Sequence, residues 1–411
     1  MASLGDSNLN FTVPSKAKNF SIALMIVGVL GIAYGFITDH DTHGTRQWAN
    51  LLVNSFFFFG ISIIGLFYIA LAYAAEAAWS TVLKRIFEAV STFLPIGGAF
   101  LLIIFLAGTF HLHHIYHWMD PELYNEFMPD GSVNPKYDEI IANKKAYLNT
   151  PFFYIRSLLY IGVWVFFQRL FRKRSLEEDL VGGLSFHRKN ITSAAIFLVF
   201  FGFTSSTSAW DWIMSIDTHW FSTLFGWYIF SGMWVSSVIF MILLIMYLKN
   251  QGYLSFVNES HIHDMGKWMF AISFLWSYLW FSQFMLIWYA NIPEEVTYYL
   301  SRFENYKFLF FFTFAINFIL PMIILMSRQV KRTPFALIFV GIVIFIGHWL
   351  DTFLCVMPGT VNEKWHLGFA EIGTFLGFLG LFIFVVLTSL TKAPLLVKNH
   401  PFLDESLHQH T

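Results

Sequence analysis

The chain has 411 residues, of which 56% are hydrophobic, 20% are aromatic and only 12% are charged. Soluble domains carry about 25% charged residues, so this composition predicts an integral membrane protein. The net charge of −1 gives no indication of a nucleic-acid partner, and the single cysteine, Cys355, excludes a disulfide framework, a cysteine-ligated iron–sulfur cluster and covalently attached haem.

Ten apolar segments are long enough to cross a bilayer, which requires roughly 20 apolar residues in a helix. They are Phe20–Ile37, Leu51–Ala75, Ala89–Phe110, Pro151–Leu170, Ile191–Ile213, Phe221–Leu248, Trp268–Ala290, Phe308–Met326, Pro334–Val356 and Leu367–Leu390. The fourth is the least regular, because Arg156 and Gln168 lie near its ends. The sequence therefore predicts an all-α polytopic membrane protein, with one membrane domain at 20–390 between polar tails at 1–19 and 391–411.

The distribution of positive charge predicts the orientation. Most of the 25 Lys and Arg residues fall on the same side as the N-terminus, including a basic connection at 169–189 that we interpret as an inner loop. Because basic connections stay in the cytoplasm, both termini are predicted to be cytoplasmic. The first 19 residues lack a cleavage site after an apolar segment and are interpreted as a retained tail. The long connection at 111–150 is then periplasmic, and a loop of this length is expected to be functional or to contact a partner.

Polar residues recur near the outer ends of the spans. Thr204, Thr207, Ser208 and Asp211 have the spacing i, i+3, i+4, i+7 and share one helical face. An acid within a span is costly and usually faces a bundle interior or a water cavity. The other outer residues of interest are Asp217, His219, His348, Asp351 and Glu371, and further polar residues that could hold waters include Ser205 and Gln283.

A second group of charges lies near the inner side, in AEAAWSTVLKRIFEAVSTFLP. Its members are Glu76, Lys84, Arg85 and Glu88. One interpretation is a pair of proton half-channels, one opening to each side and joined by the hydroxyls between them. The alternative is that both groups form interhelical hydrogen bonds and salt bridges, since Arg85 and Glu88 at i, i+3 can pair directly. Both interpretations stay open on the sequence.

The string HLHHIYHW invites a metal interpretation. On a helix, His111, His114 and His117 would be spaced i, i+3, i+6, which permits shared ligation of zinc or copper. We favour the alternative of an interfacial helix end rich in aromatic residues and histidine, so no metal is expected. The sequence also lacks nucleotide-binding loops, a nucleophile elbow and an H-E-x-x-H zinc motif, so no catalytic residue is assigned.

An internal similarity links the fifth and ninth spans. The fifth ends in SAWDWIMSID and the ninth in GHWLDTFLCVMPG. This predicts that Asp211 and Asp351 are equivalent positions of two four-helix units, made of spans two to five and six to nine.

Three strings carry a family resemblance: AWDWIMSIDTHWFSTLFGWYIFSG, HWLDTFLCVMP and WSTVLKRIFEAVSTFLP. They resemble the polysulfide-reductase-type (NrfD-like) membrane subunits of bacterial alternative complex III, and the length and ten spans are most similar to the smaller, F subunit. The resemblance covers essentially the whole membrane region. It implies two four-helix bundles with the first and last spans packed outside them. It also implies a respiratory complex of the bacterial inner membrane that oxidises quinol and reduces cytochrome c or an oxidase.

The resemblance further implies the partners and the division of labour. The expected partners are a larger homologous quinol-binding membrane subunit, an iron–sulfur subunit, c-type cytochrome subunits with their haems, a terminal oxidase and phospholipid. In that family the larger homologue is the usual site of quinol oxidation, and the smaller one is proposed to scaffold the complex or conduct protons. No redox cofactor is therefore expected on this chain.

The leading hypothesis is a non-redox subunit of a quinol:cytochrome c oxidoreductase with a proton path. In this hypothesis Glu76 and Glu88 take up protons inside, and the release groups outside are Asp211, His348, Asp351 and Glu371. A second hypothesis gives this chain its own quinol pocket on the outer side. A third is a secondary transporter, for which Gly97–Gly98 after Pro95 is the only candidate helix break.

Overall fold

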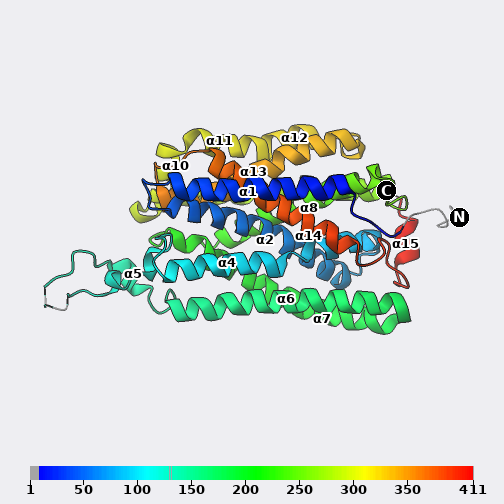
Figure 1. The fold of residues 1–411 in the computed structure, drawn as a ribbon, viewed down its shortest axis with the longest axis horizontal. Coiled ribbons are helices and arrows are strands. Elements are labelled where there is room, and N and C mark those ends of the chain that lie inside the picture. The colour runs from blue at the N-terminus through cyan, green and yellow to red at the C-terminus, as the bar shows by residue number, and fades with distance from the viewer. Residues whose placement is uncertain (1–8, 129, 131, 411) are drawn as a thin grey trace.

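The computed structural model describes residues 9–128, 130 and 132–410 and is built of helices that run roughly along one common axis (Figure 1). Within this part of the chain, ten helical segments are long and apolar enough to span a membrane, which confirms the predicted multi-pass helical architecture. Residues 1–8 of the predicted N-terminal tail lie outside the described residues.

The spans follow one another with short connections. In chain order they are α1 (Ser15–Thr38), α2 (Thr45–Ala74), the composite of η2 (Ala78–Leu83), α3 (Lys84–Ser91) and α4 (Leu94–Thr109), α6 (Thr150–Val181), α7 (Leu184–Trp212) with η5 (Met214–Ile216), α8 (Phe225–Asn250), α9 (Glu259–Ala290), the composite of α11 (Lys307–Phe314), the π-helical turn η6 (Ala315–Ile319) and α12 (Leu320–Leu325), α13 (Pro334–Val361) and α14 (Phe369–Leu390). The shorter elements are η3 (His117–Met119), η4 (Pro121–Tyr124), α5 (Glu139–Asn143), α10 (Pro293–Asn305), η7 (Val330–Arg332) and α15 (Leu403–Leu407).

Local chemistry sets the starts of several spans. The Asn149 side chain caps α6 by accepting a hydrogen bond from the backbone N–H of Phe152, and Asn258 caps α9 in a reciprocal arrangement with His261. Proline occupies the first turn of α6 and of α13, where the missing N–H has no helical partner to lose.

The helix α2 forms the centre of the molecule. It packs against α3, α4, α7, α8, α13 and α14, and nearly all of its side chains are buried. A helix that is apolar on every side is expected at such a central position. The spans around it present one face to α2 and the other outward, and α1 is the least buried of all.

The first and last spans pack on each other through glycine. A Cβ added at Gly28 would lie 2.2 Å from the Cα of Gly377, and one at Gly31 would lie 2.9 Å from the Cα of Gly373. Small residues let two backbones approach closely, which is how helices associate when lipid removes the hydrophobic driving force. The pair α1–α14 crosses the outside of the bundle, with α14 lying against α2 and α3.

The sequence prediction for the segment between the fourth and fifth spans is wrong. The predicted inner loop at 169–189 is helical, because α6 continues to Val181 and α7 starts at Leu184. Only Gly182 and Gly183, both with positive φ, make the turn. Charged residues continue a helix into water readily when ion pairs such as Lys173–Glu177, at 3.8 Å, line its surface.

The third span also differs from its prediction. It begins at Ala78 instead of Ala89, because the charges near its start pair with α6. Its helix is interrupted at Thr92 and Phe93, while the glycine pair at 97–98 lies within α4. There the glycines provide room for Phe59 and Ile161.

The two ends of the molecule differ in character. The start of α1 lies at the same end as α15, and the connection at 111–150 projects from the opposite end (Figure 1). After the orientation predicted from the sequence, we call the end with α15 the inner end and the opposite one the outer end. The C-terminal segment is folded onto the inner end: the N–H of Leu395 donates to the carbonyl of Leu9, and Ser406 bonds both Trp79 and Val82. The predicted C-terminal tail is therefore a packed cap.

Candidate functional site

An ion-pair cluster ties α3 to α6 at the inner end. Glu88 accepts hydrogen bonds from Arg85, at 2.6 Å, and from Arg172. Arg85 also pairs with Asp179 and donates to the hydroxyl of Ser175 at 3.0 Å. Both Arg85 and Glu88 are buried. The i, i+3 pair expected from the sequence is present, and charges from α6 complete its neutralisation.

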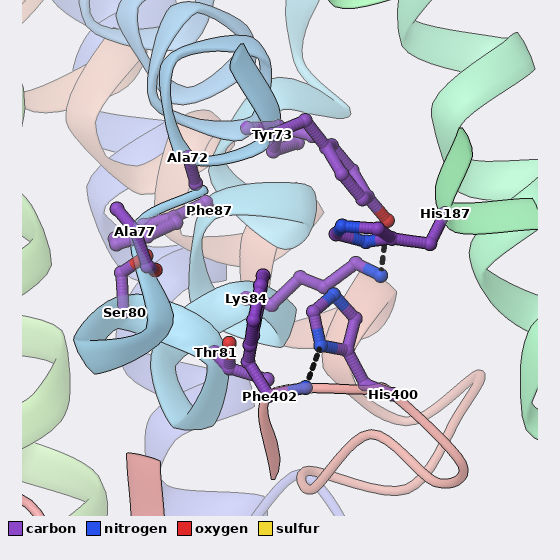
Figure 2. Close-up of a pocket in the computed structure, with 11 residues that line it drawn as sticks. Ala72, Tyr73, Ala77, Ser80, Thr81, Lys84, Phe87, His187, His400 and Phe402 are labelled. Atoms are coloured by element: carbon purple, nitrogen blue, oxygen red, sulfur yellow. Dashed lines mark hydrogen bonds between the residues drawn. The ribbon is translucent and has the colours of Figure 1, made fainter. Parts of the chain in front are cut away.

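Lys84 forms the second part of this inner cluster. Its ammonium donates to the hydroxyl of Tyr73 at 2.6 Å and to Glu178 at 3.1 Å. These groups lie beside a cavity of about 20 Å³, room for one water, into which His187 and His400 also project (Figure 2). Burial lowers the pKa of His400 to about 2, so this imidazole is neutral at physiological pH.

Glu76 is separated from the inner cluster. It lies just after α2 with a positive φ of 49°, and its side chain is 61% exposed. Its nearest charge partner is His187, 3.8 Å away. The structure therefore places Glu76 at the solvent boundary and Glu88 inside the protein.

At the outer end, Asp211 forms a two-pronged ion pair. Arg156 of α6 donates to both of its oxygens, at 2.8 Å each, and the hydroxyl of Tyr160 donates at 3.3 Å. Asp211 is fully buried, and the guanidinium of Arg156 lies 4.0 Å from the ring centre of Tyr147. Bidentate pairs of this kind are strong and geometrically specific, so this one fixes α6 to α7.

The hydroxyls below Asp211 do not form a chain with one another. Thr204, Thr207 and Ser208 each donate to a backbone carbonyl within α7. Ser205 donates weakly to the carbonyl of Gly202 at 3.5 Å, and Thr204 also accepts from the indole of Trp164. The predicted common face is present, with Thr204, Ser208 and Asp211 buried. Its hydroxyls follow the usual back-bonding pattern of helical Ser and Thr.

Asp351 of α13 has a different environment. It accepts hydrogen bonds from the hydroxyl of Tyr228 and, at 3.1 Å, from the indole of Trp276. Within the described residues no Lys, Arg or His nitrogen lies within 4 Å of its oxygens. Asp351 and Arg302 line a second small cavity, also of about 20 Å³. The Arg302 guanidinium is directed away from Asp351 to Asp217, at 3.4 Å. Asp351 is thus a buried carboxylate with neutral hydrogen-bond partners.

Asp211 and Asp351 also differ in the helices they contact. Asp211 is bound by the preceding span, whereas the partners of Asp351 come from α8 and α9. Under the predicted four-helix repeat, these partners would be in non-equivalent positions.

Several buried polar side chains of α9, η6 and α13 have no hydrogen-bond partner among the described residues, including His348, which precedes Asp351 by three residues. The rings of His348 and Trp276 are perpendicular with centres 5.2 Å apart, and neither imidazole nitrogen has a hydrogen-bond partner among the described residues. Asn317, in the π-helical turn, is fully buried and its amide is also unpartnered. The same holds for the Ser273 hydroxyl and the Gln283 carbonyl oxygen.

These unpartnered groups are energetically expensive. Each costs about 1–3 kcal/mol if left without a hydrogen bond, and native structures usually satisfy such groups with ordered water. A π-helical turn widens a helix locally and is frequent at functional sites. The core formed by α8, α9, η6 and α13 therefore has hydrogen-bonding capacity suited to internal water.

The remaining predicted outer residues are held by other elements. Glu371 accepts from Arg46 at 2.8 Å and from the N–H of Gly368 at 2.9 Å, so it caps α14 and joins it to α2. His219 lies 2.6 Å from Asp138, which caps α5 in the outer loop. These contacts attach α14 and the outer loop to the bundle.

A cavity of about 420 Å³ lies between the outer loop and the helix ends. It brings Asp217 and His219 together with His117 and Asp138 of the loop. One wall contains Trp220, whose ring stacks on that of Tyr298 with centres 3.8 Å apart.

Two of the groups in this cavity have shifted pKa values. Partial desolvation at the cavity wall, together with the nearby imidazole of His114, lowers the pKa of His117. Burial acts to raise the pKa of Asp138, but hydrogen bonds from the Ile141 N–H and from His219 outweigh it, so the pKa lies below its usual value. The carboxylate of Asp138 is therefore charged at any physiological pH.

The histidine string does not form the predicted helical array. The helix α4 ends at Thr109, and His111 has a positive φ of 56°, so the helical spacing no longer applies. His113 turns inward, 2.9 Å from the carbonyl of Ile104. Over the described ranges, no three His, Cys, Asp or Glu side chains are arranged to hold a metal ion.

Several residues that complete these sites were missed by the sequence reasoning. They are Arg46, Tyr73, Arg172, Glu178, Asp179, Tyr228, Trp276, Arg302 and Asn317. A signal existed for Glu178 and Asp179, because acids inside a basic stretch indicate ion pairing. The sequence also gave a signal at Arg156, because a cation in an apolar span needs a partner of opposite charge.

The sequence was also compared with known proteins. It matches no protein-family model and no curated protein.

Proposed function

We propose that this chain is an integral membrane subunit of a bacterial quinol:cytochrome c oxidoreductase of the alternative complex III type, without redox centres of its own. Its partners supply those centres: a larger quinol-binding homologue, an iron–sulfur subunit and c-type cytochromes. The chain scaffolds this assembly in the inner membrane, with both termini cytoplasmic, and conducts protons. The proposal rests on the three strings in α3, in α7–α8 and in α13, and the ten apolar helices are compatible with it.

We further propose that the spans form two four-helix units. The first contains α2, α3–α4, α6 and α7, and the second contains α8, α9, α11–α12 and α13. In support, α6 packs against α4 and α7, while α9 packs against α8 and α12. In this proposal the pair α1–α14 lies outside both units, which is the arrangement that the family resemblance implies.

The observation that carries the proton-conducting role is the environment of Asp351. Asp211, Glu88 and Glu371 are all engaged by arginine, and protonating any of them would break an ion pair. Asp351 has only neutral donors, so it can gain and lose a proton without breaking an ion pair.

The proposed path runs through the second unit. Waters bound to His348, Asn317 and Ser273 would deliver protons to Asp351, which lies beside the small cavity that it shares with Gln283 and Arg302. Arg302 pairs with Asp217, which lines the large outer cavity, and protons would leave through the water of that cavity. The ion pairs of Asp211 and of the inner cluster then favour the structural interpretation, in which they hold helices together.

The test uses the complex that co-purifies with this chain, reconstituted in liposomes. With Asp351→Asn, proton release per electron is expected to fall to the amount set by quinol oxidation alone. Asp404→Asn, at an exposed position on α15, is the control for removing a carboxylate and should leave the ratio unchanged. An unchanged ratio in Asp351→Asn would refute proton conduction through this residue.

A second candidate function is quinol binding by this chain, favoured by the outer cavity. A quinol ring could stack on the wall formed by Trp220 and Tyr298, and His219 with Asp138 could accept its protons. Solvent extraction of the chain separated from its partners discriminates the two: bound quinone favours this candidate, and its loss in Trp220→Ala places it in this cavity.

A further inference from the structure

An apolar groove lies on the membrane-facing surface, near the end of the molecule that carries the N-terminus. It has a volume of about 620 Å³ and runs between the start of α1, the end of α8, the first half of α13 and α14. Its walls are aliphatic and aromatic side chains such as Phe240, Phe345 and Leu379. Ile342 and Ile346 on α13 are more than 40% exposed along it. This surface is apolar, and none of the described residues fills it.

The groove has the depth of one bilayer leaflet. Along α14 its lining extends from Phe375 to Leu387, a separation of twelve positions, which at 1.5 Å per residue is about 18 Å. Half of a hydrocarbon core about 30 Å thick is about 15 Å. One extended acyl chain therefore fits its length.

The polar groups of the groove gather at one end. Lys16 lies in the first turn of α1, while Tyr247 and Gln251 lie at the end of α8, at the same membrane boundary. Among the described residues of the lining, Lys16 is the only charged one, and no carboxylate accompanies it. A cation at this depth attracts the phosphate of a lipid headgroup.

The walls of the groove are fixed by the close contact of α1 with α14. A Cβ on Gly380 would lie 2.7 Å from both the Leu24 side chain and the Ser21 carbonyl, so the two backbones touch just beside the groove. A preformed groove costs little ordering when it binds its occupant. This distinguishes it from the flexible side-chain surface that contacts ordinary surrounding lipid.

We propose that the groove is a specific site for one anionic phospholipid, with an acyl chain along α14 and the phosphate beside Lys16. The occupant is a phospholipid and not a quinone, because the described residues that line the deep part of the groove include no polar side chain to bind a quinone ring. The site depends only on the membrane-spanning fold, and it is independent of the proposed redox complex. It would hold α1 against the bundle from the leaflet side.

The test is native mass spectrometry of the full chain released from nanodiscs that contain phosphatidylglycerol or phosphatidylcholine. One phosphatidylglycerol is expected to remain bound, and Lys16→Ala is expected to weaken its retention about fivefold, the typical effect of one lysine at a membrane surface. Leu379→Trp, which fills the groove, should abolish retention. Lys18→Ala is the matched control, since Lys18 is exposed on the same helix and does not line the groove.

Three results would overturn the proposal. Equal retention of phosphatidylcholine would mean surrounding lipid only, and equal losses in Lys16→Ala and Lys18→Ala would mean a general surface-charge effect. Recovery of quinone in place of phospholipid would assign the groove to another ligand. Size-exclusion profiles identify any variant that fails to fold. If Leu379→Trp fails to fold, Lys16→Ala still tests the proposal, because it changes an exposed side chain.

Discussion

Replacing Arg156 by methionine is predicted to destabilise the fold by about 3–5 kcal/mol, the usual cost of removing one partner from a buried ion pair. Asp211 is fully buried, and the substitution would remove both of its 2.8 Å hydrogen bonds from the guanidinium. The hydrogen bonds from two tyrosine hydroxyls, that of Tyr160 at 3.3 Å and that of Tyr147, would remain. The double variant Arg156→Met/Asp211→Leu is expected to recover most of this loss, because neither charge then stays buried alone.

The assay is reversible unfolding in mixed micelles by titration with sodium dodecyl sulfate, which gives the change in unfolding free energy. Lys173→Met is the control on the same helix, since its pair with Glu177 is exposed and about 3.8 Å long. It should cost no more than about 0.5 kcal/mol. The reasoning is refuted if Arg156→Met costs as little as this control, or if the double variant is less stable than Arg156→Met.

Three further predictions concern packing, acid sensitivity and the polar core. Gly28→Ala should weaken the α1–α14 contact by at least about 1 kcal/mol, because the new Cβ would lie 2.2 Å from the backbone of Gly377. The control Gly202→Ala, whose Cβ would lie in open space, should be neutral or stabilising. Equal effects of the two substitutions on stability would contradict the close packing. The lowered folded-state pKa of Asp138 gives a stabilisation that is present above its unfolded pKa near 3.8 and is lost as pH falls through the lower folded value. Hydrogen exchange of the 111–150 loop should therefore rise below about pH 4, and Asp138→Asn, which keeps the helix cap but loses the ionised pair with His219, should remove that dependence. Asn317→Leu should leave stability unchanged or raise it while lowering proton release per electron; a large loss of stability would mean that this amide is already satisfied.

The sequence predicted the membrane spans because they depend on local composition. A run of about 20 apolar residues must form a helix in lipid, so even the fourth span, with Arg156 near its start, exists as predicted. The errors occurred where charged residues continue a helix beyond the apolar run. The start of the third span and the segment at 169–189 were assigned to connections, yet both are helical because their charges neutralise one another.

The site was less accessible to sequence reasoning, because its contacts join residues far apart in the chain. Arg46 and Glu371 are 325 positions apart, and nothing local to either residue predicts the other. Helical spacing did predict the pairing of Arg85 with Glu88 and the shared face of Thr204 and Asp211. Helical spacing could not predict that Asp211 pairs with an arginine while Asp351 accepts from a tyrosine and a tryptophan. These partners depend on how the helices are rotated against one another.

The central claim is that this chain belongs to a quinol-oxidising respiratory complex. The most direct measurement is affinity purification of the tagged chain from its native membranes in mild detergent, followed by reduced-minus-oxidised absorption spectroscopy and mass spectrometry of the co-purifying proteins. The account predicts the spectrum of c-type haem, together with an iron–sulfur subunit and a larger homologous membrane subunit in stoichiometric amounts. A colourless chain that purifies alone would contradict it and would favour a secondary transporter.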